Sequence, residues 1–306
     1  MMRTRSIAVG FIVLASLLMT QPPVSVAQED EPPPITVTDV GVGYIDGAVI
    51  GNQLRIRFDA ATGINQPNRA EFLWGWPPPQ GPGPSLDETN VDYQRLSFYL
   101  EQVFSEHWSW FVEAPVLFSQ AEVNSDADGF SDLQAGVKWN LVRQWDRLLT
   151  LQLRTYVPTG KAADGLGSGH VTLEPGLLYF SQPAADWTLE GELRAWIPVD
   201  ATPLRHGNIL RYGLGASYHW GDLGCLQVRP VVEFVGWTVL DGQSRFATGP
   251  GTFLVEDADG QTIVNGKYGL RLGTGQGRDL YIGYGHALTS NRWYRDIVRL
   301  EWRIDY

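Results

Sequence analysis

The amino-acid sequence predicts an all-β fold: a closed antiparallel transmembrane β-barrel of twelve strands, with short periplasmic turns and longer external loops. Three observations predict this fold. Segments of about ten to thirteen residues alternate apolar and polar side chains, which is the period of a strand with two different faces. The connections between these segments alternate between short and long. Aromatic residues gather near the segment ends, where a barrel meets the lipid head groups.

The composition excludes several other classes of protein. The chain of 306 residues carries 23 Lys+Arg against 34 Asp+Glu, a net charge of −11, which argues against a nucleic-acid partner. Its aromatic content of 12% excludes a disordered chain, and its single cysteine, Cys225, excludes a disulfide scaffold. One apolar run, residues 7–19, is too short for a helical membrane protein. No motif indicates a cofactor.

The first 27 residues have the pattern of a signal peptide. Arg3 and Arg5 precede an apolar stretch at residues 7–18, and Ser25-Val26-Ala27 places small residues before a cleavage site. An N-terminal membrane anchor is the alternative for this stretch. Export through the inner membrane places the mature chain outside the cytoplasm, and the barrel pattern then predicts the bacterial outer membrane and its lipid as the surroundings.

The exported chain divides into two parts. Residues 28–50 form an acidic, proline-rich leader, of which residues 28–38 are expected to have no fixed structure. The strand pattern then runs through residues 51–306, which we expect to be the barrel.

The twelve segments are justified by their alternation. In the fourth segment, for example, Leu133 and Val137 lie on one face, whereas Gln134 and Lys138 lie on the other. No segment spaces its apolar residues as a helix would, so helix content should be close to nil. The segments are residues 51–59, 91–104, 108–118, 132–142, 147–158, 171–181, 187–197, 209–220, 226–238, 263–273, 279–288 and 294–306.

The connections favour a membrane barrel over a soluble sandwich. A sandwich also alternates, but it rarely keeps one strand length and alternating connection classes over a whole chain. In lipid every backbone group must be paired, so the sheet must close on itself. An even number of strands returns both ends to the periplasm. The short connections are residues 105–107, 143–146, 182–186, 221–225 and 274–278.

The aromatic residues predict two belts. The chain also finishes on Tyr306, after alternating Trp302 and Ile304, an ending that resembles the last strand of bacterial outer-membrane barrels. The belt at the short turns is predicted from Trp108, Trp139, Trp145, Trp187, Tyr218 and Trp220. The belt at the long loops is predicted from Phe118, Tyr156, Trp237, Trp293 and Tyr294.

Three motifs resemble those of a known family. Asp128-Gly-Phe-Ser-Asp132-Leu begins one strand, Tyr156-Val-Pro-Thr-Gly160 ends the next, and Leu166-Gly-Ser-Gly169 follows in the loop. They resemble a bacterial family of outer-membrane transporters named for the meta-cleavage pathway of phenol degradation. Ser131 stands where that family usually has Gly, and Ser168 where it often has Thr. The resemblance implies a barrel that passes small molecules, and it implies no catalytic residues.

The polar face of each segment should point into the lumen. A polar lumen is filled with water or with ion-paired side chains, and twelve strands should enclose a narrow passage. We therefore expect a channel for the passive passage of small, amphipathic or aromatic solutes. We do not expect this protein to be an enzyme. A structural or adhesive barrel that binds a partner through its loops is the alternative. The predicted pore-lining residues are Glu113, Lys138, Arg154, Glu174, Glu192, Arg194, Arg211, Arg229, Glu233, Arg271, Arg299 and Glu301.

Hairpin register predicts a row of alternating charge across the lumen. Facing residues in a hairpin have a nearly constant sum of residue numbers, because the turn sets the register. The connections then place Arg154 opposite Glu174, Arg194 opposite Glu174, and Lys138 opposite Glu113. The resulting row would stabilise the barrel modestly and would orient a polar solute.

Four other patterns are weaker. Asn124, Asp126 and Asp128, with Asp132 close behind, match the first half of a calcium loop, but the acidic residue expected at position twelve is absent. A polar turn is the better interpretation. Likewise His107-Trp-Ser109 has the spacing of a phospholipase dyad but lies at a short turn.

Two further motifs lie in predicted external loops. Gly165-Leu-Gly-Ser-Gly169 precedes a strand, whereas a phosphate cradle needs a helix after it, so we interpret it as an external loop. The first long loop contains Trp74-Gly-Trp-Pro-Pro-Pro79 and Gly81-Pro-Gly-Pro84 and is stiff enough to fold over the barrel mouth.

The signal peptide generates a direct test. Cleavage should occur between Ala27 and Gln28, because the small residues of the Ser25-Val26-Ala27 motif precede that bond. N-terminal sequencing of the protein purified from the membrane fraction should begin at Gln28. An intact Met1 in that fraction would contradict the assignment of the compartment.

Overall fold

A computed structural model describes residues 35–67, 74–199, 207–249, 252–274 and 276–306. The predicted signal peptide and residues 28–34 of the predicted leader lie outside the described residues. Among the described residues, no helix is long and apolar enough to span a membrane.

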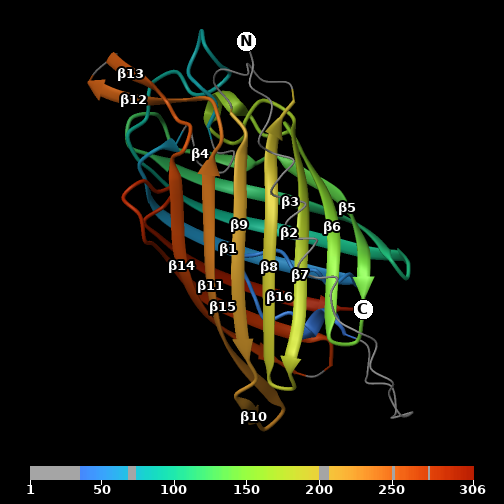
Figure 1. The fold of residues 1–306 in the computed structure, drawn as a ribbon. Helices are drawn as coiled ribbons and strands as arrows, with labels where there is room; N and C mark the ends of the chain where they lie inside the picture. Colours follow the sequence, from blue (N-terminus) through green and yellow to red (C-terminus); the bar gives the residue numbers. More distant parts are fainter. Residues whose placement is uncertain (1–34, 68–73, 200–206, 250–251, 275) are drawn as a thin grey trace, which may run out of the picture. The chain divides into compact units, whose positions relative to one another are not determined.

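The described residues form a closed antiparallel ring of twelve strands, as the alternation predicted (Figure 1). Each strand pairs with its neighbours along the chain, and the first pairs with the last, with Gln53 facing Asp305 and Thr62 facing Asp296. The strands are β1 (Gln53–Ile64), β2 (Val91–Ser105), β3 (Trp108–Ala121), β5 (Leu133–Arg143), β6 (Arg147–Val157), β7 (Thr172–Ala184), β8 (Trp187–Pro198), β9 (Ile209–Tyr218), β11 (Leu226–Val239), β14 (Thr262–Gly273), β15 (Arg278–Ala287) and β16 (Asp296–Asp305).

Several short elements were not predicted. Two three-residue 3-10 helices, η1 (Val37–Asp39) and η3 (Ala162–Asp164), are the helical elements described. The other additions are β4 (Ala127–Phe130), which pairs with β3, β10 (Gly221–Leu223), which pairs with β11, and the separate hairpin of β12 (Gln243–Gly249) and β13 (Thr252–Asp257).

The outer face of the ring is apolar because alternate side chains point outward. Leu300 on β16 faces Phe58 on β1 and Ile282 on β15, and Leu300 and Ile282 are both more than 40% exposed. Such a surface suits lipid rather than water. The predicted aromatic belt at the short turns is present: the Trp108 and Trp139 rings stack with centroids 5.2 Å apart, and both side chains are exposed.

The aromatic belt predicted at the long loops is wrong for most of its members. Phe118 is exposed, but Tyr156, Trp237, Trp293 and Tyr294 are buried. Their rings fill the inside of the barrel near the long loops, with the Trp237 and Trp293 centroids 4.8 Å apart. The physical reason is parity: Tyr156 and Trp237 belong to the inward set of their strands, and the Trp293–Tyr294 turn folds into the lumen.

The predicted charge row rests on three registers, of which one is right and two are wrong. The two ion pairs at its centre nevertheless form, with Glu174 lying 3.8 Å from Arg154 and 2.7 Å from Arg194. Arg154 faces Glu174, as predicted. Arg194 faces Gly176 instead of Glu174, because β7 continues to Ala184 and the turn before β8 is shorter than the predicted one. In this register and in the one described next, the facing residue is displaced by an even number of positions, so the inward side chains stay inward.

The third register differs because of β4. The predicted single loop after β3 contains this extra strand, which pairs with β3 first. β5 therefore pairs with the first part of β3, residues 108–113, so Glu113 faces Gln134 and Lys138 faces Ser109.

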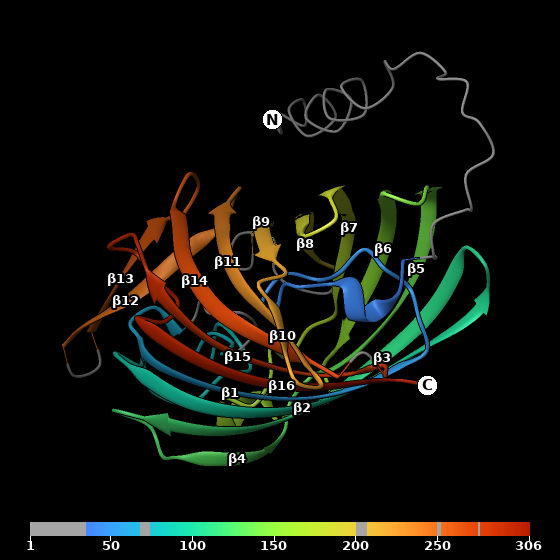
Figure 2. The ribbon, with the colours of Figure 1, turned by 90° about the horizontal axis from the view of Figure 1, so that it is seen from below.

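The largest departure from the sequence expectation is residues 35–52, which we call the inserted segment. The sequence assigned residues 35–50 to a leader ahead of the barrel, but they form one compact unit with it. Figure 2, seen from the short-turn end, shows this segment in blue inside the ring of strands. Val42, Tyr44 and Ala48 are each at most 5% exposed.

The outer face generates a stability prediction. Leu300→Arg places a charge in the middle of the lipid-facing surface and should lower the free energy of unfolding by about 2–4 kcal/mol. Urea unfolding of the barrel in lipid vesicles measures the change. Leu86→Arg is the matched control, since Leu86 is exposed in an external loop. Equal stability of both variants would contradict a lipid-facing β16.

Candidate functional site

The inserted segment enters and leaves the lumen at the short-turn end. Near its start, the Arg229 guanidinium of β11 donates to the Thr38 carbonyl oxygen at 3.0 Å. Near its end, Asn52 accepts a hydrogen bond from the Tyr306 amide, and Gln53 begins β1 beside the C-terminus. The segment is therefore a loop that rises into the barrel and returns, with Tyr44 and Asp46 at its tip.

Cations of the barrel wall bind the carbonyl oxygens of this loop. Arg271 donates to the Gly41 carbonyl at 2.8 Å, and Arg299 donates to the Gly43 carbonyl at 2.5 Å. Each buried carbonyl needs a donor, since no strand runs alongside the segment. Further bonds of this kind run from Arg303 to Val40, from Arg271 to Val42, from Arg211 to Tyr44 and from Lys138 to Gly47, and the Thr150 hydroxyl donates to the Ala48 carbonyl.

Carboxylates of the wall bind the amide groups of the same loop. Glu190 accepts from the Gly41 and Val42 amides at 2.8 and 3.2 Å. Glu233 accepts from three consecutive amides, of which the Tyr44 amide is 2.9 Å away. Since both carboxylates are almost fully buried, they satisfy backbone donors that would otherwise be costly to bury.

The tip of the loop is held by ion pairs. The Asp46 carboxylate lies 2.5 Å from Arg154 and 2.9 Å from Arg194, and it accepts from Gln152 at 3.2 Å. Glu174 lies behind these cations, 2.7 Å from Arg194. Buried pairs of this geometry fix the position of the groups more surely than they add stability.

Glycines give the loop its close fit. A Cβ atom at Gly43 would overlap the Tyr281 ring, and one at Gly41 would overlap the Ser217 side chain. On the wall, a Cβ atom at Gly213 would overlap Ile45. The inward glycines therefore leave room for the inserted segment rather than for an empty lumen.

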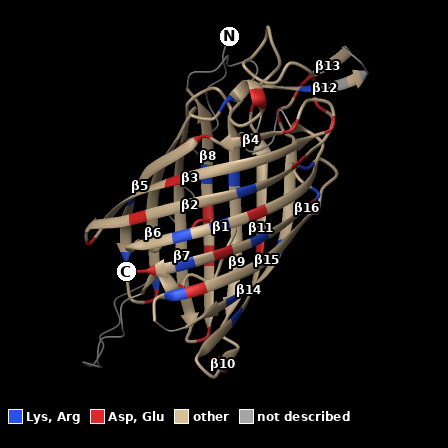
Figure 3. Ribbon diagram, turned by 180° about the vertical axis from the view of Figure 1, so that it is seen from behind, with Lys and Arg blue, Asp and Glu red and all other residues tan. Residues whose placement is uncertain are grey.

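Eleven of the twelve predicted pore-lining residues are buried, and Arg229 is half-buried. Figure 3 shows blue and red positions side by side on neighbouring strands. Glu113 and Glu301 pair with Arg57 at 3.8 and 2.8 Å, so these two acids, with Glu174, pair within the wall. The nine that contact the inserted segment are Lys138, Arg154, Glu192, Arg194, Arg211, Arg229, Glu233, Arg271 and Arg299.

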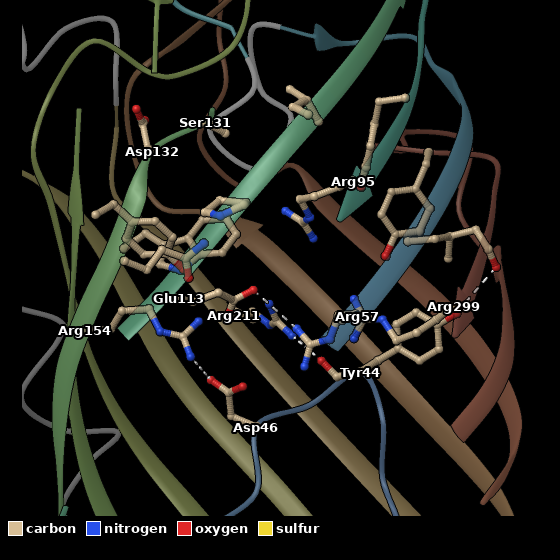
Figure 4. A pocket seen from close by; sticks show the side chains of 18 of the residues that line it. Tyr44, Asp46, Arg57, Arg95, Glu113, Ser131, Asp132, Arg154, Arg211 and Arg299 are labelled. Atoms are coloured by element: carbon tan, nitrogen blue, oxygen red, sulfur yellow. Dashed lines mark hydrogen bonds and ion pairs between the residues drawn. The ribbon is translucent and has the colours of Figure 1, made fainter. Parts of the chain in front are cut away.

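Above the tip of the loop lies a cavity, which we call the vestibule (Figure 4). It offers about 70 Å³ to the centres of water-sized spheres, and Tyr44 and Asp46 form part of its lining. Its cationic side chains are Arg57, Arg95, Arg154, Arg194, Arg211, Lys267 and Arg299. Its acidic side chains are Asp46, Glu113 and Asp132, and its aromatic ones are Tyr44, Tyr93, Tyr156, Trp196, Trp237 and Tyr294.

The three family motifs meet at the rim of the vestibule. The Asp132 carboxylate accepts from the Gly160 amide at 3.0 Å and from the Ser168 amide and hydroxyl at 2.8 Å each. A Cβ atom at Gly167 would overlap this carboxylate. Burial raises the pKa of the Asp132 carboxyl, and these hydrogen bonds oppose the rise. The motifs thus form a clasp that fastens the loop after β6 to the start of β5.

The first long loop packs against this clasp. A Cβ atom at Gly165 would meet the buried Trp74 ring at 2.7 Å, and one at Gly169 would meet Pro82. Arg245 of the β12–β13 hairpin donates from its Nε and Nη2 atoms to the two carboxylate oxygens of Asp87. The external loops are therefore fastened to one another.

The weaker candidates have structural partners. Among the calcium candidates, Asn124 binds Leu86 and Glu88, Asp126 accepts from Ala121, and Asp132 holds the clasp. The described residues contain no group of three or more His, Cys, Asp or Glu able to hold a metal ion. The remaining calcium candidate, Asp128, lies in β4.

The two residues of the phospholipase-like motif, His107 and Ser109, lie in different surroundings. The Ser109 hydroxyl is buried and donates to Glu101 at 2.6 Å, whereas His107 is exposed in the turn. Cys225 is exposed in a short turn.

Sequence reasoning missed the inserted segment and hence Tyr44 and Asp46. One signal was present: Val40-Gly-Val-Gly-Tyr44 alternates glycine with larger residues, as a chain needs where it is enclosed on all sides. The segment pairs with no strand, so the strand pattern could not find it.

Known proteins resemble this chain. A family model described as "Putative MetA-pathway of phenol degradation" matches residues 73–286. An outer-membrane channel from Pseudomonas putida F1 matches 87% of this chain and 100% of its own, with 11% identity and a TM-score of 0.54. The NanC porin matches 83% of this chain and 98% of its own, with 8% identity and a TM-score of 0.47. No curated protein matches.

The clasp generates a prediction. Asp132→Asn keeps the shape of the side chain but weakens its charged hydrogen bonds, a loss of about 1–3 kcal/mol. The loop after β6 should open more often, and trypsin should cut faster after Lys161, which is exposed in that loop. Asp186→Asn, at a short turn, is the control. Unchanged cleavage in Asp132→Asn would show that the clasp does not hold the loop.

Proposed function

The chain belongs to the family described as "Putative MetA-pathway of phenol degradation", and from that membership we propose that it is an outer-membrane channel for the passive passage of small solutes. The observation that carries this proposal is the vestibule, a cavity inside a barrel whose outer face suits lipid. A solute that enters from the long-loop side meets polar and aromatic side chains and then the tip of the inserted segment.

In this conformation the inserted segment closes the channel. Its backbone is bonded to side chains of β5, β6, β8, β9, β11, β14 and β16, so it occupies the lumen between the vestibule and the short-turn end. Passage requires this segment to move toward the short-turn end. Its bonds are numerous, but they are made by side chains, which can exchange them for water one at a time.

The vestibule also supports the class of solute. Six aromatic side chains beside charged ones favour small amphipathic or aromatic molecules over large hydrophilic ones. A structural or adhesive barrel would need no such cavity. A hydrolase would need a nucleophile beside a base, and the hydroxyl of Ser109 binds Glu101 inside the barrel while His107 faces outward.

The proposal is tested by loosening the inserted segment. Glu233→Gln weakens the acceptor of three backbone amides and should raise the open population, and with it the single-channel conductance events, about tenfold. Liposome swelling with sugars, alcohols and aromatic solutes then ranks the solutes. Glu106→Gln, exposed at a short turn, is the matched control and should behave as the wild type.

A deletion variant keeps this test decisive. Removal of residues 35–50 leaves all twelve strands intact and should give steady conductance. If the deleted protein folds, as heat-modifiable migration in gels reports, yet passes no solute, the channel proposal is wrong and a structural or adhesive barrel takes its place.

A further inference from the structure

We propose that the vestibule is a binding site for small aromatic anions, of which an aromatic monocarboxylate is the simplest. The inference deepens the proposed function, because it names the class of solute that the channel would take up first. It rests on three independent features of the cavity: the sign of its charge, the direction of its donors and the chemistry of its walls.

The charge that faces the cavity is positive. Seven cationic side chains line it against three acidic ones. The acidic partners of the cations lie behind them: Asp59, which pairs with Arg95 and Arg299, is fully buried, as is Glu174. A solute therefore meets guanidinium groups first, while the carboxylates that orient them stay in the wall.

The acidic groups of the lining are already occupied. Asp46 is held by Arg154 and Arg194, and Asp132 is held by the clasp. Glu113 lies 3.8 Å from Arg57. Because these acceptors have donors of their own, they offer little to a cationic solute.

The donors converge from different strands. Arg57 on β1 uses its Nε and Nη2 atoms to bind Glu301, at 3.0 and 2.8 Å. Figure 4 shows Arg57, Arg95 and Arg211 directed toward the same space from separate strands. Guanidinium groups held in this way suit the two oxygens of a carboxylate and lose little side-chain entropy on binding it.

The aromatic wall provides the second half of the recognition. Trp196, Trp237 and Tyr294 line one side of the vestibule, with Trp293 packed behind them at 4.8 Å from the Trp237 ring centroid. A planar ring of a solute can pack on this wall with the offset-stacked or edge-on geometry that aromatic pairs prefer.

One buried donor in the wall points to a ligand in particular. The Trp237 side chain is 1% exposed, and within the described residues its indole N–H has no hydrogen-bond partner. Buried indole N–H groups usually find an acceptor. An anionic oxygen in the vestibule would supply one, next to the Arg211 guanidinium that lies 5.6 Å from the Trp237 ring centroid.

The test measures binding without relying on conduction. Isothermal titration of the full-length mature protein in detergent with benzoate, benzyl alcohol, benzylammonium and acetate separates charge from ring. Benzoate should bind at least about tenfold more tightly than each of the other three, since it alone has both an anionic head and a ring. Equal affinity for benzyl alcohol overturns the role of charge, and equal affinity for acetate overturns the role of the aromatic wall.

Two variants locate the site. Arg95→Gln removes a cation at the cavity and should weaken benzoate binding about tenfold, whereas Arg147→Gln, at a short turn, removes the same charge without effect. Trp237→Phe keeps a ring but removes the N–H and should weaken benzoate binding several-fold. Unchanged affinity in both Arg95→Gln and Trp237→Phe, with folding confirmed by heat-modifiable migration, places the benzoate elsewhere and overturns the inference.

The outcomes distinguish this inference from the channel proposal. Benzoate binding by the intact protein, together with no conduction after deletion of residues 35–50, would uphold the site and refute the channel. Conduction by the deletion variant, together with no benzoate binding by the intact protein, would uphold the channel and refute the site.

Discussion

The structure depends on one constraint: every buried backbone group must have a hydrogen-bond partner. The strands meet it by closing into a ring, with β1 paired to β16. The inserted segment cannot meet it in the same way, because it runs through the lumen with no strand beside it. Charged side chains of the wall take the place of a neighbouring strand, with carboxylates such as Glu233 accepting from amides and guanidiniums such as Arg271 donating to carbonyls.

This constraint explains the dense charge of the lumen. A water-filled pore needs a polar lining, but it does not need Arg271 to donate to two successive carbonyls or Glu233 to accept from three successive amides. The lumen side chains of the wall are therefore arranged to bind the backbone of the inserted segment. The vestibule lies where that segment stops. Four of its cations, Arg154, Arg194, Arg211 and Arg299, also bind the tip of the loop.

The features that the sequence predicted correctly are those that the strand periodicity determines. Each strand has a lipid face and a lumen face, so alternation located all twelve strands and the inward set of charges. The register of Arg154 and Glu174 followed from a simple hairpin, whereas Lys138 and Glu113 were misplaced because β4 pairs with β3 ahead of β5. The inserted segment escaped prediction because its position is determined by side chains from seven strands, not by its own pattern.

The family motifs likewise combine a local sequence pattern with contacts that only the fold creates. Their presence was readable in the sequence, but the reason for it was not, since Asp132, Gly160 and Ser168 are brought together only by the fold. A carboxylate that holds two loop amides needs glycines around it, and the motif supplies them.

The covalent attachment of the inserted segment to β1 has a further consequence. Asn52 and Gln53 join the segment directly to the wall, so a displaced segment stays within a few nanometres of its binding surface. Its return is an intramolecular event, governed by an effective concentration in the range of about millimolar for a short tether, and not by how much protein the membrane holds. In the proposed channel the individual contacts can therefore be weak without the occupied state being rare, and the opening of one barrel does not depend on its neighbours.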